Sequence, residues 1–76
     1  MAQFAKRHYE RIAEAMQEAK RAATHDLDAQ HQIAAIAGIN ICIRELADVF
    51  AGDNGQFKRD RFERACQLGA NVRARS

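Results

Sequence analysis

The spacing of apolar residues near the start of the chain predicts a helix over residues 3–23. These residues recur at alternating intervals of four and three, which places them on one face of a helix. They are Ala5, Tyr9, Ile12, Met16, Ala19 and Ala23. We expect this face to meet the core, and we expect charged side chains to occupy the outer face. The expected outer residues are Glu10, Glu14, Lys20 and Arg21.

A second helix is predicted over residues 27–50, after the cap-forming residues Thr24 and Asp26 interrupt the first pattern. Two apolar stripes lie side by side on it. One comprises Ala29, Ile33, Ile36, Asn40, Ile43, Ala47 and Phe50, and the other comprises Ala35, Ile39, Cys42, Leu46 and Val49. A helix that is apolar over so wide an arc must be covered on more than one side.

The rest of the chain is too short to cover both stripes, so we expect the fold to be completed by homodimerisation through this helix. The expected dimer interface consists of Ile36, Ile39, Asn40, Ile43 and Leu46. Ala34 and Gly38 form a pair of small residues that favours the close approach of another helix. Asn40 has two interpretations of equal weight: it fixes the register of a helix pair, or it bonds within its own subunit or faces water.

Residues 51–56 predict a turn, with Gly52 suited to a left-handed helix cap. A third helix is predicted over residues 58–68, ending at Gly69. Its inward residues are Phe57, Phe62, Ala65 and Cys66. Residues 70–76, with Arg73 and Arg75, are predicted to form a basic flexible tail.

The length and composition agree with a single all-α domain over residues 1–69. The chain has 76 residues, which is too short for a two-domain enzyme. It contains no proline and has 47% apolar residues, a composition typical of a helical globular domain. The longest apolar run, residues 33–43, is interrupted by Asn40 and is much shorter than the roughly 20 residues of a membrane span. No secretory signal pattern precedes it. We therefore expect a cytoplasmic protein with no membrane partner.

The net charge of +2 is unevenly distributed. Residues 1–23 carry five bases and three acids, residues 24–56 carry one base and five acids, and residues 57–76 carry six bases and two acids. The segment charges are therefore +2, −4 and +4. This polarity predicts that a basic end of the domain binds an acidic partner.

No set of residues has the spacing of a catalytic or metal site. Cys42 and Cys66 lack the close spacing of a zinc or redox motif and are predicted to be buried thiols. The three histidines contain no pair four residues apart. A calcium loop aligned on Gly55 would place Phe50, Gly52 and Arg61 at ligand positions, and none of them supplies the side-chain oxygen that such positions need. We expect no metal, no cofactor and no enzymatic activity.

The predicted third helix carries the main candidate binding residues, which are Lys58, Arg59, Arg61 and Arg64. Arg59 and Arg64 are expected to be the most exposed of them. Such a cluster binds phosphates or an acidic protein surface, or it is merely a solvated face. A DNA-recognition role is disfavoured because this helix lacks the asparagine and glutamine side chains that often read adenine.

The segment 50–66 resembles a signature of small phage and prophage-encoded helical proteins, Asn-Pro-x-Phe-Asp-Arg-x-Arg-Phe-x-x-Ala-Cys. The matching residues are Asn54, Phe57, Arg59, Arg61, Phe62, Ala65 and Cys66. An N-terminal Tyr-x-x-Ile-Ala element of these proteins is matched by Tyr9, Ile12 and Ala13. The chain departs from the signature in having Gly55 for the proline and Lys58 for the aspartate.

The resemblance implies a phage or prophage accessory protein. It would bind and inhibit or redirect a host protein or protein complex, including a bacterial defence complex such as a CRISPR effector. One alternative is a small nucleic-acid-binding regulator that uses the basic third helix. Another is a minor phage assembly component whose functional unit is the dimer itself.

Overall fold

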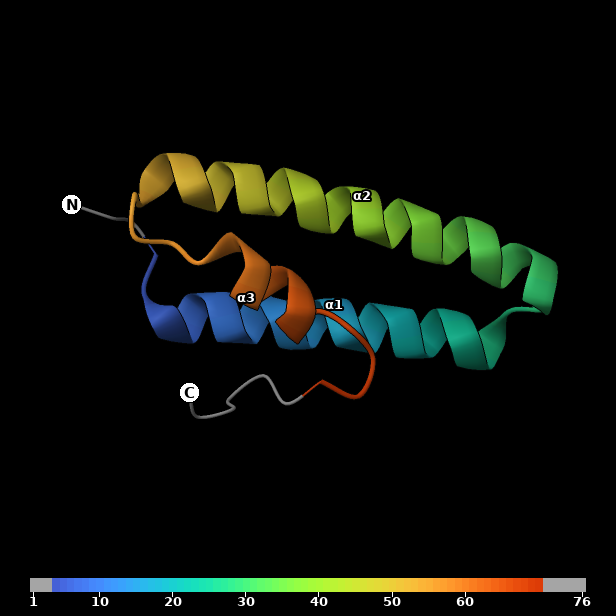
Figure 1. The fold of residues 1–76 in the computed structure, drawn as a ribbon. Helices are drawn as coiled ribbons and strands as arrows, with labels where there is room; N and C mark the ends of the chain where they lie inside the picture. Colours follow the sequence, from blue (N-terminus) through green and yellow to red (C-terminus); the bar gives the residue numbers. More distant parts are fainter. Residues whose placement is uncertain (1–3, 71–76) are drawn as a thin grey trace.

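A computed structural model of the protein describes residues 4–70, and this part of the chain is all-α with no strand. Helix α1 spans Lys6–Asp26, α2 spans Ala29–Asp53 and α3 spans Arg59–Ala65. The two long helices form an antiparallel hairpin (Figure 1). The short α3 lies over the half of the hairpin that is farther from the α1–α2 turn. A long central helix in a three-helix arrangement was predicted from the sequence, and this prediction is confirmed.

The turn between α1 and α2 is held by two side chains. Asp28 is the N-cap of α2, and its carboxylate accepts the backbone N–H of His31 at 2.9 Å. Gln32 reaches back from the first turn of α2. Its amide nitrogen donates to the carbonyl oxygens of Thr24 and Leu27 at 2.9 and 2.6 Å. These contacts occupy carbonyls at the end of α1 that have no partner within that helix.

The core is built around the aromatic side chains of the chain. All five of them, four phenylalanines and one tyrosine, belong to one cluster formed by Phe4, Tyr9, Phe50, Phe57 and Phe62. Phe50 is at its centre, with ring centroids 5.0 Å from Phe4, 4.9 Å from Tyr9 and 5.3 Å from Phe62. Edge-to-face and tilted rings at these separations pack favourably. The cluster therefore joins the start of α1 and the end of α2 to Phe62 of α3 and to the segment that precedes α3.

The core occupies only one half of an elongated molecule that measures 43 × 24 × 16 Å. The buried residues of α2 are Ile43, Ala47 and Phe50, all in its second half. None of residues 29–42 is buried. The half of the hairpin near the α1–α2 turn thus consists of two helices without a third element over them (Figure 1).

Two polar residues of α1 bind the end of α3. The Gln17 amide nitrogen donates to the carbonyl oxygens of Ala65 at 2.6 Å and Ala70 at 3.0 Å. The Lys20 ammonium donates to the side-chain oxygen of Gln67 at 3.3 Å. Gln17 and Lys20 are only 8% and 2% exposed. Lys20 was predicted on the outer face of α1, and this was wrong because the turn after α3 covers it.

The predicted element boundaries differ from the observed ones at several ends. Helix α1 begins and ends three residues later than expected, and α2 continues to Asp53 instead of stopping at residue 50. Gly52 was predicted as a left-handed cap, but it lies inside α2, and the C-cap Asn54 is extended. Helix α3 ends at Ala65, and Gly69 adopts φ +78° in the turn that follows. Residues 71–76 of the predicted tail lie outside the described part of the chain.

The predicted burial of α2 was wrong over residues 29–42. Cys42 is exposed although it was expected to be a buried thiol, and Ile33 on the first stripe is 74% exposed. A Cβ added at Gly38 would meet no other atom within 4 Å, so no helix of the same chain approaches it. Ile33 and Gly38 lie in the half of α2 that the two turns of α3 do not reach, and Cys42 lies outside the face that carries the buried residues Ile43, Ala47 and Phe50.

The Asp28 cap should make the stability of α2 depend on pH. The backbone N–H of His31 and its ring hold the pKa of the Asp28 carboxyl below its usual value. A lowered folded-state pKa adds stability above the ordinary aspartate range and loses it as the pH falls through the lowered value. Asp28→Asn keeps a capping oxygen that does not titrate. We expect the melting-temperature advantage of the parent over this variant to shrink as the pH falls below about 4 and to disappear once it is below the lowered pKa, measured by circular dichroism.

We expect the two hydrogen bonds that Gln17 donates to stabilise the folded protein. Gln17→Leu removes both hydrogen bonds that the buried Gln17 donates to the half-buried carbonyls of Ala65 and Ala70, which costs about 1–3 kcal/mol. Urea denaturation should show this loss in the free energy of unfolding. Gln56→Leu, at an exposed position, is the matched control and should change stability by less than about 0.5 kcal/mol. Equal effects of the two changes would contradict the role of Gln17.

Candidate partner-binding site

The four basic residues predicted to bind a partner do not form one surface. Lys58 and Arg61 line a pocket between α1 and α3. Arg64 is exposed and does not line it. Arg59 turns toward α2. Of the four predicted residues, two therefore line the pocket, one lies on the open surface and one contacts α2.

Arg59 connects α3 to α2. Its guanidinium Nε donates to Glu63 at 2.8 Å within α3, and its other nitrogens contact the Asp48 carboxylate and the carbonyl oxygen of Arg44, the latter at 3.4 Å. The bond to Asp48 is the main reason that the pKa of Arg59 is raised, with Glu63 second. Arg59 was predicted to be among the most exposed cations. That prediction was wrong, because the carboxylates hold its side chain against the protein.

The pocket has a volume of about 320 Å³ and an aromatic lining. Phe4 and Tyr9 contribute from the start of the chain, and Phe57 and Phe62 contribute from the segment around the start of α3. These rings are the outward side of the same cluster that forms the core. A rigid aromatic wall of this kind suits an apolar group of a ligand or partner.

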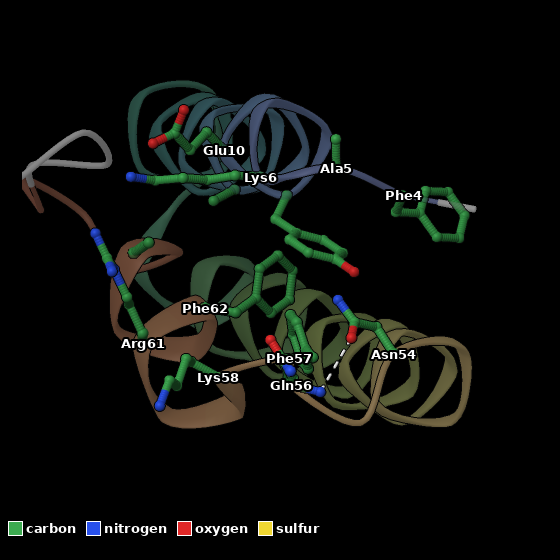
Figure 2. Close-up of a pocket in the computed structure, with 13 residues that line it drawn as sticks. Phe4, Ala5, Lys6, Glu10, Asn54, Gln56, Phe57, Lys58, Arg61 and Phe62 are labelled. Carbon is green, nitrogen blue, oxygen red and sulfur yellow. Dashed lines mark hydrogen bonds between the residues drawn. The ribbon is translucent and has the colours of Figure 1, made fainter. Parts of the chain in front are cut away.

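Charged side chains surround these rings. Lys6, Lys58 and Arg61 supply three cations, and Glu10 supplies one anion. In Figure 2 the charged ends of these cations extend away from the rings of Phe57 and Phe62. The segment joining α2 to α3 closes another side, where the Gln56 backbone N–H donates to the Asn54 side chain at 3.0 Å. The pocket thus combines an apolar interior with a net positive rim.

The Tyr9 hydroxyl is unusual within this lining. Among the described residues it is the one buried side-chain polar atom that lacks a hydrogen-bond partner. An unpaired buried hydroxyl costs about 1–3 kcal/mol. The ring of Tyr9 lies 4.9 Å from Phe50 and 4.8 Å from Phe57 between centroids, and these contacts offset part of that cost.

The predicted dimer-interface residues are also separated by the fold. Ile43 is 3% exposed and belongs to the core of the single chain, so it was wrong to expect its side chain mainly at an interface. Ile39 and Leu46 are half-buried and pack against the same core. Ile36 is half-buried, and Asn40 is exposed, in agreement with the interpretation in which it faces water. The difference arises because α1 and α3 already cover this side of α2.

The described residues contain no group of three histidine, cysteine, aspartate or glutamate side chains placed to hold a metal ion. Cys66 is fully buried, and burial raises the pKa of its thiol to about 11. Such a thiol is a poor nucleophile at neutral pH. No helix within residues 4–70 has the length and apolar character required to cross a bilayer.

Sequence reasoning missed the contribution of α1 to the pocket. Lys6 was assigned no role, and Tyr9 was assigned only to the core. A signal was present, since the aromatic residues are confined to the first nine residues and to 50–62. Their clustering predicts that these segments meet. It does not predict that a cavity remains between them.

No protein-family model, curated protein sequence or solved structure matches this chain. The resemblance to small phage proteins therefore stays a prediction from the motif residues.

The separation of Arg59 from Arg64 can be tested by charge reversal. Arg59→Glu places an anion beside Asp48 and Glu63 and should lower the melting temperature by several degrees. Arg64→Glu, on the exposed side of the same helix, should leave it within about 2 °C. Thermal denaturation followed by circular dichroism measures both. Equal melting temperatures for the two variants would show that the Arg59 contacts do not hold α3.

Proposed function

We propose that this protein is a small phage- or prophage-type accessory protein that acts by binding a host protein or protein complex, through the pocket between α1 and α3. The partner would present an acidic segment with one apolar side chain. That side chain enters the aromatic pocket, and the neighbouring carboxylates meet the cationic rim. The observation that carries this proposal is the aromatic pocket of about 320 Å³ bordered by Lys6, Lys58 and Arg61.

Two properties of the pocket support recognition of a protein. Its wall is made of aromatic rings that pack against one another and against the core, so little side-chain freedom is lost on binding. Aromatic and arginine side chains are also the residue types that most often dominate binding energy at protein interfaces. The signature residues Phe57, Arg61 and Phe62 line this pocket, which links the site to the phage-protein resemblance.

A nucleic-acid partner is the second candidate, because Lys58 and Arg61 could contact phosphates. It is disfavoured because anionic side chains are interspersed with the cations. Asp60 and Glu63 lie on α3 itself, and Glu10 lies at the pocket. Strong phosphate binding requires a more uniform basic surface.

Paired charge reversals test the assignment to the pocket. Lys6→Glu with Lys58→Glu reverses two exposed rim cations, whereas Arg7→Glu with Arg64→Glu reverses two exposed cations that do not line the pocket. Tagged proteins are used for capture from a bacterial host lysate, with quantitative mass spectrometry. We expect the rim variant to lose at least tenfold of its captured partner, equivalent to about 1.4 kcal/mol, and the control to lose less than twofold.

The competing outcomes are distinct. Equal capture by the two variants would contradict a partner site at the pocket. Titration of the parent with a fluorescent DNA duplex at 50 and 200 mM salt measures the alternative. Tight binding that weakens steeply with salt would favour the nucleic-acid regulator over the protein binder.

A further inference from the structure

The outer side of α2 carries an exposed apolar strip. We define the outer strip as Ile33, Ala34, Ala37 and Ile41, with Gln30 and Arg44 at its two ends. Ile33 is 74% exposed and Ile41 is 51% exposed. Gln30, Ile33, Ala37, Ile41 and Arg44 recur at intervals of three and four, so they follow one line along the helix, and Ala34 lies beside it. Ile33 is the most exposed large apolar side chain among residues 4–70, and no described residue of α1 or α3 covers it.

A groove of about 430 Å³ lies beside this strip. Its α2 side is formed by Ala37, Asn40, Ile41, Ile43 and Arg44, and Glu63 and Gln67 of the α3 segment form the opposite side. The groove is therefore apolar at its base and polar at its margin. Helix α2 thus presents the exposed Ile33 and, about two turns further along, the groove that Ile41 lines.

We propose that a second copy of this chain binds here, with the two α2 helices antiparallel and related by a two-fold axis near Ala37. Ile33 and Ile41 are each four residues from Ala37. The two-fold axis therefore places Ile33 of each copy against Ile41 and into the groove of the other. An isologous interface requires this reciprocity, in which residue i contacts residue j and j contacts i. Small side chains at Ala34, Ala37 and Gly38 allow the helices to approach closely.

The charges along α2 favour the antiparallel arrangement. Asp28 lies at the start of the helix, and Arg44 lies in its second half. A parallel pair would place Asp28 against Asp28 and Arg44 against Arg44. In the antiparallel pair, Arg44 lies near Gln30 and the acidic start of the other helix. The two Arg44 guanidinium groups are thereby separated, and each approaches an acidic helix start. Asp48 also comes near that start, but its carboxylate is already paired with Arg59 of its own chain.

The same arrangement explains which part of α2 remains uncovered. Residues 29–42 contain no buried residue, and this is the stretch that the second copy covers. Of the interface residues predicted from the sequence, Asn40 keeps a place at the groove and Ile43 contributes only its base. This surface does not include Lys6, Lys58 or Arg61, so self-association does not depend on the proposed partner site.

A matched pair of substitutions on α2 tests the proposal. Ile33→Glu places a charge in the outer strip. Val49→Glu places the same charge at a 57% exposed apolar position of the same helix, outside the strip. We expect sedimentation equilibrium to give twice the chain mass for the parent and for Val49→Glu at micromolar concentration. Ile33→Glu should weaken dimerisation at least tenfold, with an unchanged circular dichroism spectrum.

Cross-linking tests the orientation. In a Cys42→Ser background, Ile33→Cys with Ile41→Cys introduces two exposed thiols, while Cys66 is buried. Mild oxidation of an antiparallel dimer should give disulfides between position 33 of one chain and position 41 of the other, identified by peptide mass spectrometry. Bonds joining 33 to 33 and 41 to 41 would overturn the antiparallel arrangement. A monomeric parent, or equal dissociation by Ile33→Glu and Val49→Glu, would overturn the proposed interface.

Discussion

The packing of five aromatic side chains around Phe50 is the interaction on which the rest of the structure depends. Helix α3 has seven residues and could not persist alone, because isolated helices shorter than about 12 residues are marginal in water. Phe62 anchors it to Phe50, and Phe57 anchors the preceding turn to Tyr9. Because every aromatic residue is used at this end, the other half of the hairpin has no aromatic side chain to pack it.

Polar contacts then set the orientation of α3 on this aromatic base. Gln17 and Lys20 hold the turn after the helix, and Arg59 ties its first residue to Asp48 of α2. Each contact joins α3 to one of the two long helices. Together they direct Arg59 inward while Arg64 stays exposed, so the basic residues of one short helix have different roles.

The uneven distribution of core residues gives the molecule two different surfaces. At the aromatic end, rings that stabilise the fold also form the wall of a pocket with a basic rim, which is the proposed partner site. At the other end, two helices alone leave the outer strip of α2 uncovered, which is the proposed site for a second copy. The surfaces use different residues, so a dimer would present two pockets at once. Paired sites increase the apparent affinity for a partner with repeated binding segments.

The sequence by itself determined the all-α class, the three helices and the inward positions of Phe62 and Cys66, since these follow from local periodicity and caps. Tertiary structure alone decided the burial of Lys20, the exposure of Cys42 and Ile33, and the separation of Arg59 from Lys58 and Arg61. Each of these depends on where a two-turn helix lies on a 25-residue helix. Periodicity identifies which faces of a helix are apolar. It does not contain the length over which a neighbouring element covers them.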